Sequence, residues 1–587
     1  MRKIVAALLM GSVSMAAVSA SAAEAEQAWI AKSNSYTQKL LDIDLKHSPE
    51  QGSGEGLAKF DKLIGDPRMS DDLAERKEFE AALAKIKTAS AKETDPAVKQ
   101  DLAILDKAFA LRFRQENFSW EHEVSFYNAS AQIFQGLRVL LDDQVAAERR
   151  PAALERLKKY VGAEKGFTPY AELLKERAIA QMAKPGVIYP SKGQLETELG
   201  RNINYVNGIA DLFKKYNIKG WEKPYEQLKA QMTAYDDWVR LTILPKARTD
   251  FRLPPEKYAM ELEGYGIDIP PDQLAAMAHK AFDEIQGQMK VVAAQVAKDK
   301  GFADPDYHAV ITELKKGQIT GEAILPFYEN RLHQIEQIIR DKNIVTLPDR
   351  PAIIRLATAA ETAQVPAPHM TPPPFLHNTG QRGEFVLPLN IPPADGGKAD
   401  VYDDFTYDGI TWTLTAHEAR PGHELQFDSM VEKGVSLARA LYAFNSTNAE
   451  GWGLYSEYVM QPYEPSEGQL GTLQFRLQRA ARAFLDPELQ SGKMTPEQAY
   501  DVLEKQVMLS HAMAKQEVER YTFRSPGQAN SYFYGYTRLL SLRQETETAL
   551  GAKFDQKKFH DFILAQGLLP PDLMRKAVVE SFIPSQK

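Results

Sequence analysis

Apolar residues recur three and four positions apart along most of the first half of the chain, with Gly or Pro between the runs. This spacing places apolar side chains on one helix face, so residues 24–343 are predicted to be almost entirely helical. One helix is predicted between Pro270, which suits a helix start, and Gly301, which suits a helix end. The run from Asp95 to about Asp143 is predicted to hold two or more helices.

The pattern changes between Leu347 and Asp400, where prolines are frequent. Proline lacks an amide hydrogen and biases the preceding residue away from helix, so the stretch VPAPHMTPPPF is predicted to be extended. A short strand is predicted within residues 383–390, and Pro388 restricts that strand to a sheet edge. Four apolar residues indicate the strand: Phe385, Val386, Leu387 and Leu389.

Helical spacing resumes at Tyr402, so the expected fold class is mainly α with a small β element at a cleft. Residues 1–23 combine two basic residues, an apolar run and a small-residue exit, which is typical of a secretory signal peptide. Residues 24–346 are expected to form a helical region that covers the cleft. Residues 347–587 are expected to form the catalytic region.

Composition narrows the class of protein. Hydrophobic residues make up 44% and charged residues 26%, as in ordinary globular proteins, and no later stretch has the roughly 18 apolar residues that a membrane span needs. The formal net charge is −8 without a basic stripe, so no nucleic-acid partner is expected. The absence of cysteine excludes disulfides, thiolate ligands and a cysteine-linked lipid anchor. With the signal peptide, this indicates a periplasmic or secreted protein.

The segment TLTAHEARPGHELQF contains two histidines six positions apart, His417 and His423. Zinc-peptidase helices usually present two histidines one turn apart with a glutamate beside the first, because positions i and i+4 share a face. In an undistorted helix, six positions correspond to a rotation of about 120°, so both rings could not reach one ion. On a regular helix these histidines would be unrelated polar residues.

Pro421 provides a reason for the helix to break between the two histidines. It cannot donate a hydrogen bond to the carbonyl of His417, and Gly422 gives the freed backbone room to turn. A helix broken or widened at residues 420–422 is therefore predicted to bring His417 and His423 to one metal ion.

A second helix is predicted in STNAEGWGLYSEY, capped by Ser446, Thr447 or Asn448 and carrying Glu450 in its first turn. A catalytic zinc takes three protein ligands and leaves a fourth position for water, so Glu450 is a candidate third ligand. Glu457 is expected either to hydrogen-bond a metal ligand or to be a solvated charge.

A third segment places a Ser-Pro-Gly loop before a helix with three tyrosines, Tyr532, Tyr534 and Tyr536. One phenol can stabilise negative charge on a substrate oxygen, although tyrosines at this spacing also line cores and clefts. Tyr532 is the preferred candidate because it ends the stretch PGQANSY.

The motifs HEARPGHELQ, EGWGLYSE and PGQANSY, followed by Gly535, together resemble the bacterial proteins grouped as domain of unknown function 885. That family is similar to the gluzincin metallopeptidases, the clan of angiotensin-converting enzyme and thermolysin. The resemblance implies a zincin-like helical fold with a small substrate-binding sheet. It also implies that His417, His423 and Glu450 hold Zn²⁺ and that Glu418 is the catalytic carboxylate. Four residues separate Glu418 from His423 here, whereas the usual gluzincin motif has two.

The expected function is zinc-dependent, exopeptidase-like hydrolysis of short peptides, because the long helical region would exclude folded proteins from the cleft. Glu418 would be the general base, Tyr532 the oxyanion donor and strand 383–390 the partner of the substrate backbone. The alternatives are a metal-dependent amidase for a non-peptide amide and a non-catalytic zinc-binding periplasmic protein.

Six further residues have two open interpretations. Four arginines either bind a terminal carboxylate of the substrate or form surface ion pairs: Arg382, Arg420, Arg524 and Arg538. Two histidines either lie near the site or are structural or surface residues: His377 and His511.

Overall fold

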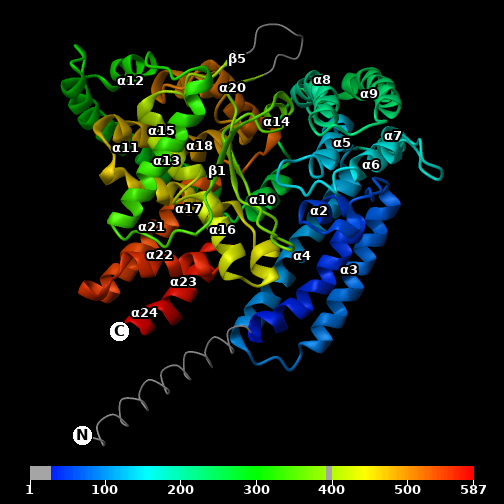
Figure 1. Cartoon of the computed structure of the whole chain (residues 1–587), viewed down its shortest axis with the longest axis horizontal. Coiled ribbons are helices and arrows are strands. Elements are labelled where there is room, and N and C mark those ends of the chain that lie inside the picture. Colours follow the sequence, from blue (N-terminus) through cyan, green and yellow to red (C-terminus); the bar gives the residue numbers. More distant parts are fainter. Residues whose placement is uncertain (1–27, 392–399) are drawn as a thin grey trace, which may run out of the picture.

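The structure is a computed structural model that describes residues 28–391 and 400–587 (Figure 1). It is mainly helical, as predicted, with a few short strands. The predicted signal peptide lies outside the described residues. Among the residues that are described, no helix is long and apolar enough to cross a membrane.

Helices make up most of residues 28–346, as the apolar spacing predicts. After a first helical stretch, 28–47, these helices are α2 (Pro49–Gly54), α3 (Met69–Ala89), α4 (Pro96–His122), α5 (Ala129–Arg138), α6 (Ala152–Tyr160), α7 (Tyr170–Met182), α8 (Lys192–Lys215), α9 (Glu222–Thr242), α10 (Pro255–Gly264), α11 (Pro271–Lys300), α12 (Tyr307–Lys315) and α13 (Ile324–Asp341). The helix predicted between Pro270 and Gly301 is α11. Gly301 ends it in the left-handed region, with a φ of 72°. The run after Asp95 forms α4 and α5, as predicted.

The small β element consists of two sheets. The three-stranded sheet has the order β1-β3-β2, with β1 (Ile353–Leu356) parallel and β2 (His369–Thr371) antiparallel to β3 (Glu384–Leu387). The short helix α14 (Ala359–Gln364) lies between β1 and β2 in the chain. A two-stranded sheet pairs β4 (Asn390–Ile391) with β5 (Asp400–Val401).

The prediction that the strand within residues 383–390 lies at a sheet edge is wrong. The strand β3 is central, because β1 pairs with one side of it and β2 with the other. Pro388 does not prevent this arrangement, since it follows the last strand residue, Leu387, and removes no hydrogen bond from the ladder.

The chain after residue 407 returns to helices. They are α15 (Asp408–Glu418), α16 (His423–Lys433), α17 (Ser446–Met460), α18 (Ser466–Gln490), α19 (Pro496–Asp501), α20 (His511–Glu519), α21 (Asn530–Leu550), α22 (Gln556–Ala565), α23 (Pro571–Ala577) and α24 (Ile583–Gln586). Short 3₁₀ and π-helical turns connect several of them, including the π-helical turns η6 (Val502–Gln506) and η7 (Arg520–Arg524).

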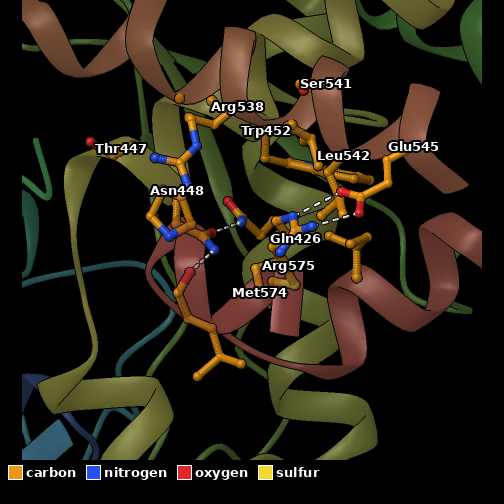
Figure 2. Close-up of a pocket in the computed structure, with 16 residues that line it drawn as sticks. Gln426, Thr447, Asn448, Trp452, Arg538, Ser541, Leu542, Glu545, Met574 and Arg575 are labelled. Atoms are coloured by element: carbon orange, nitrogen blue, oxygen red, sulfur yellow. Dashed lines mark hydrogen bonds and ion pairs between the residues drawn. The ribbon is translucent and has the colours of Figure 1, made fainter. Parts of the chain in front are cut away.

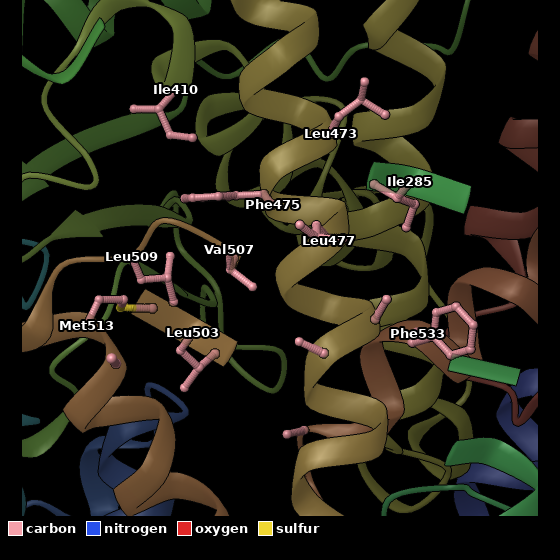
Figure 3. Packing of buried hydrophobic residues seen from close by; sticks show 14 of the residues in the cluster. Ile285, Ile410, Leu473, Phe475, Leu477, Leu503, Val507, Leu509, Met513 and Phe533 are labelled. Carbon is pink, nitrogen blue, oxygen red and sulfur yellow. The ribbon is translucent and has the colours of Figure 1, made fainter. Parts of the chain in front are cut away.

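The largest hydrophobic core forms around α18. It joins Ile285 of α11, Ile410 of α15, Leu477 of α18 and Phe533 of α21 with residues of η6 and α20 (Figure 3). Helices from both sides of residue 347 therefore share this core. In Figure 1, α11, α13, α15, α17 and α18 form one group, and α2–α9 lie to one side of it. This core fixes α15 and α21 relative to each other, and a second core adds α17 through contacts that include Trp412, Trp452 and Tyr532. These three helices carry His417, Glu418, Glu450 and Tyr532.

Candidate metal centre

The helix that carries the first histidine is broken as predicted. Helix α15 ends at Glu418 and α16 begins at His423. The indole Nε1 of Trp452 donates to the carbonyl oxygens of Pro421 (2.9 Å) and Gly422 (3.2 Å), which lie in this break. A side chain of α17 therefore satisfies buried backbone groups in the break.

Position 422 requires glycine, because the backbone there folds back closely against the end of α15. A Cβ atom at this position would lie 1.9 Å from the carbonyl oxygen of His417 and 2.4 Å from that of Ala416. No side chain fits at such distances, so the break has room only for glycine. The Pro-Gly pair thus accounts for a six-residue spacing that a regular helix cannot use.

The break brings the three predicted ligands together. One ligand atom each from His417, His423 and Glu450 lies within 4.8 Å of the other two. Glu450 Oε2 is 3.4 Å from His417 Nε2 and 3.3 Å from His423 Nε2. Tetrahedral zinc with bonds of about 2.0–2.1 Å holds its ligand atoms about 3.4 Å apart. These two spacings fit the geometry of a zinc site.

The chemistry of the donor set also fits a cation. Glu450 Oε2 is buried and accepts no hydrogen bond from any residue in the described ranges. Burial would raise the pKa of Glu450, but the two imidazoles outweigh it and hold that pKa well below its usual range. Two imidazoles and one carboxylate are a common protein ligand set of catalytic zinc. The residues present therefore fit Zn²⁺.

The surroundings of Glu450 and His417 involve residues of two sequence motifs, EGWGLYSE and PGQANSY. The predicted cap of α17 is wrong by one residue: Asn445 is the N-cap, and its side chain accepts from Asn448 N at 2.8 Å, so Glu450 lies in the second turn. Gly453 leaves room for the imidazole, since a Cβ there would lie 2.6 Å from His417 Cε1. Gln528, from the PGQANSY stretch, places its amide 3.5 Å from Glu450 Oε1.

Glu457 is fully buried and contacts the candidate ligand His417, so the interpretation as a solvated charge is wrong. Its Oε1 lies 2.7 Å from His417 Nδ1 and 3.3 Å from a guanidinium nitrogen of Arg479. Burial would raise the pKa of Glu457, but Arg479 and His417 lower it below its usual value. The ionised carboxylate accepts the Nδ1 hydrogen and leaves His417 Nε2 directed toward Glu450.

The protonation of His417 follows from the same carboxylates. Burial would lower the pKa of His417, but Glu450 and Glu457 raise it to about 9 when no metal is bound. Zinc requires a neutral imidazole, so binding of the ion must release this proton.

Glu418 lies next to the three candidate ligands but is not one of them. Its carboxylate lies 4.0 Å from His417 Nε2. Burial raises its pKa, and the imidazoles of His417 and His423 lower it to a smaller extent. A carboxylate with a raised pKa beside a metal site is suited to accept a proton from water.

Of the three tyrosines, Tyr532 lies against the candidate metal centre. Its ring is nearly parallel to that of His417, with the centroids 6.3 Å apart. The hydroxyl of Tyr534 instead donates to Asp268 and accepts from Arg538. Tyr536 packs against Tyr458, with the ring centroids 6.1 Å apart.

The four arginines and two histidines with open interpretations all make their contacts away from the candidate metal centre. Arg420 is buried and pairs with Glu336 and Glu424, each at 2.7 Å. Arg524 pairs with Glu519 at 3.1 Å, and Arg538 pairs with Asp268 and Asp572. Arg382 donates to the carbonyl oxygen of Pro351. His377 and His511 are both exposed, and His511 contacts Glu504. None of these contacts involves the candidate metal centre.

Three arginines near the centre were missed by the sequence analysis. Arg479 contacts Glu457, Arg482 forms a two-pronged pair with Glu517, and the Arg520 guanidinium lies 3.4 Å from the Tyr532 hydroxyl. A signal for two of them was present, because Arg479 and Arg482 are three positions apart in the stretch LQRAARAFL, whose other residues are mostly apolar. Buried charges at such positions need partners.

A cavity of about 80 Å³ lies between α17, α21 and α23 (Figure 2). Gly451 and Trp452 line it, and both are close neighbours of Glu450 in the chain. On its wall, Gln426 of α16 donates to Asn448 of α17 at 2.9 Å. None of the three ligands lines this cavity, so its wall supports the ligand helices without contacting the metal position.

The chain belongs to the family described as bacterial protein of unknown function (DUF885), which matches residues 49–578. A solved structure of a candidate lipoprotein from Colwellia psychrerythraea is similar, with 20% identity and a TM-score of 0.75 over 95% of this chain and 99% of that one. A candidate lipoprotein of unknown function from Shewanella oneidensis has 20% identity and a TM-score of 0.69, over 93% and 99%. No curated protein matches the chain. The two structures share the fold of this protein.

Proposed function

We propose that this protein is a zinc-dependent peptidase that trims short peptides outside the cytoplasm. The observation that carries this proposal is the convergence of His417 Nε2, His423 Nε2 and Glu450 Oε2 at spacings that suit zinc, with Glu418 beside them. The arrangement supports a zincin-like fold and membership of the gluzincin clan, in which a broken helix replaces the usual shorter spacing.

The proposed chemistry divides into the role of the ion and the roles of the chain. Zn²⁺ held by the three ligands supplies a Lewis acid that lowers the pKa of a water toward about 7. Glu418 accepts a proton from the attacking water and delivers it to the leaving amine. Tyr532 donates a hydrogen bond to the scissile oxygen, where negative charge develops. The hydrogen bond to Glu457 keeps His417 oriented throughout.

The sheet offers a different strand to substrate than the sequence analysis expected. Because β3 is paired on both sides, its backbone is not available. The edge strand β2 packs against α16, the helix that begins with His423. We therefore assign the pairing with an extended substrate to β2.

The extracytoplasmic location is supported by the signal-peptide pattern of residues 1–23. The two similar solved structures carry the name lipoprotein, which also fits a protein outside the cytoplasm. This location gives access to short peptides that enter from the surroundings.

The proposal is tested by incubating the zinc-loaded protein with a mixture of short peptides and identifying the released products by mass spectrometry. We expect release of terminal residues, and Glu418→Gln should slow it by about 10²–10⁴-fold at equal zinc content. Rapid internal cleavage of a folded protein would contradict the exopeptidase assignment.

Three other results would each replace the proposal. Cleavage of non-peptide amides alone would make the protein an amidase. A zinc-loaded protein that cleaves neither class would be a zinc-binding protein without turnover. If Glu418→Gln were as active as the wild type, Glu418 would not be the base.

A further inference from the structure

Arg520 is a half-buried guanidinium with no carboxylate partner. It begins the π-helical turn η7, and its Nη1 lies 3.4 Å from the hydroxyl of Tyr532. Across residues 28–391 and 400–587, it forms no ion pair within 4 Å. Because removing a cation from water is costly unless it is paired, an unpaired arginine at this depth indicates a site for an anion.

No neighbouring carboxylate among the described residues pairs directly with Arg520, although, against the effect of burial, the charge of Glu517 raises the pKa of Arg520 from a distance. Two further guanidinium groups lie near Tyr532, but each has its own carboxylate: Arg482 pairs with Glu517 at 2.7 Å and Arg479 with Glu457 at 3.3 Å. Zinc would bring two positive charges, which Glu418 and Glu450 balance. These carboxylates are therefore engaged by other groups, and within the part of the chain that the structure describes Arg520 has no carboxylate in direct contact to match its charge.

Arg520 also faces a cavity large enough for part of a substrate. This solvent-open cavity has a volume of about 350 Å³, within the range of small-ligand sites. Its walls come from both halves of the chain: Gln194 of α8, residues 364–367 ahead of β2, and Gln516 and Arg520 near η7. A peptide that pairs with β2 beside the metal would therefore have the cavity and Arg520 within reach.

We infer that Arg520 binds the C-terminal carboxylate of the peptide substrate, so that the protein trims peptides from their C-terminus. This inference rests on the proposed function and names the end of the substrate that the site recognises. A planar guanidinium matches a carboxylate with two parallel hydrogen bonds, which gives both affinity and orientation. Arg520 also contacts the hydroxyl of Tyr532, which is proposed to face the scissile oxygen. The C-terminal carboxylate would therefore be bound next to the oxyanion donor.

Arg524 provides a matched control within the same cavity. Its guanidinium lines the cavity as Arg520 does, but it is already paired with Glu519 at 3.1 Å. Replacing Arg524 removes one positive charge from the cavity wall, as replacing Arg520 does. The guanidinium lost is one that already has a carboxylate partner. Only Arg520 is expected to discriminate between a carboxylate and a neutral terminus.

The test compares peptides of one sequence that end in a free acid or in an amide. For the zinc-loaded wild type, kcat/KM should be higher for the acid by roughly 10- to 100-fold. Arg520→Gln should remove this preference, mainly by raising KM for the acid, whereas Arg520→Lys should keep part of it. Arg524→Gln should keep the full preference.

A binding measurement separates failure of this inference from failure of the proposed function. In the Glu418→Gln background, calorimetry with N-acetyl-trialanine as acid and as amide should show the same preference without turnover, and Arg520→Gln should abolish it. Equal binding of the two forms by the Glu418→Gln protein would overturn the inference. So would a preference that persists in Arg520→Gln, or one that follows an acidic side chain instead of the terminus. The protein could also bind the acid through Arg520 and yet cleave no peptide. That result would support the carboxylate site and refute only the peptidase proposal.

Discussion

The imidazole Nδ1 of His417 donates a hydrogen bond to the buried carboxylate of Glu457 over 2.7 Å. The two residues come from different helices, α15 and α17, which a hydrophobic core containing Trp412, Ala416 and Trp452 holds together. With Nδ1 committed to Glu457, only Nε2 remains for a metal ion, and it points toward Glu450. The orientation of His417 is thus set by Glu457, which is not part of the candidate ligand group.

Replacing Glu457 should weaken the metal site without removing a ligand. Glu457→Gln keeps the size of the side chain but loses the charge that orients His417 and pairs with Arg479. We expect zinc affinity to fall by about 10- to 100-fold, as measured by competition with a chromophoric chelator. Glu467→Gln, which affects a surface pair with Lys300, is the control. Unchanged affinity in Glu457→Gln would show that the hydrogen bond does not position the ligand.

Removing one hydroxyl tests the role of Tyr532. Tyr532→Phe keeps the ring that lies against His417, so zinc content and stability should hold. Loss of one oxyanion donor should lower kcat for peptide cleavage by about 10²–10³-fold. Tyr534→Phe is the matched control, because its hydroxyl contacts Asp268 and Arg538 instead. An equal fall in both variants would remove the assignment from Tyr532.

The break between α15 and α16 can be tested at Gly422. In Gly422→Ala the new Cβ would collide with the carbonyl of His417, so the break must rearrange and the two histidines must separate. We expect a lower melting temperature and loss of zinc, measured by calorimetry and elemental analysis. Gly287→Ala in α11 is the control, since a Cβ there meets no atom within 4 Å and alanine favours a helix by about 1 kcal/mol. Full zinc occupancy in Gly422→Ala would contradict the requirement for glycine.

The stability of the fold should depend on pH through Glu464. Burial raises the pKa of Glu464 to about 8, from a usual value of 4.5, with the charge of Glu457 adding to the effect. Between these values the unfolded chain releases the proton and the folded chain keeps it. The Glu464 contribution to the free energy of unfolding is therefore full below about pH 4.5 and falls as pH rises to about 8, by at most about 1.4 kcal/mol per pH unit.

Glu464→Gln should remove this part of the pH dependence, because the amide resembles the neutral acid and still accepts from Thr472. Urea unfolding at pH 5, 6, 7 and 8 measures the slope for both proteins. Identical slopes would show that Glu464 is ionised in the folded protein.

Local chemistry made the helix break predictable from the sequence. Proline lacks the amide hydrogen that a helix needs, so Pro421 alone forces an interruption between His417 and His423. Two histidines six positions apart are useful to one ion only across such a break. For the same reason the helix from Pro271 to Lys300 was predicted closely, since proline and glycine mark its ends.

Features that depend on distant partners were not predictable from the sequence. Pro388 suggested an edge strand, but the position of β3 is decided by β1 and β2 on either side of it. Glu457 looks like a surface charge in its own segment, and its burial depends on Arg479 of α18. The unpaired state of Arg520 is likewise a property of the folded neighbourhood, because nothing in its sequence context sets it apart from Arg524.

An anomalous difference map tests most directly whether one metal ion is held by His417, His423 and Glu450. Crystals of zinc-loaded protein would be measured on both sides of the zinc absorption edge. We predict one strong peak per chain, about 2.0–2.1 Å from Nε2 of each histidine and about 2.0–2.2 Å from Glu450 Oε2. A map with no peak between these three atoms, in crystals grown from protein with one bound zinc, would contradict the account.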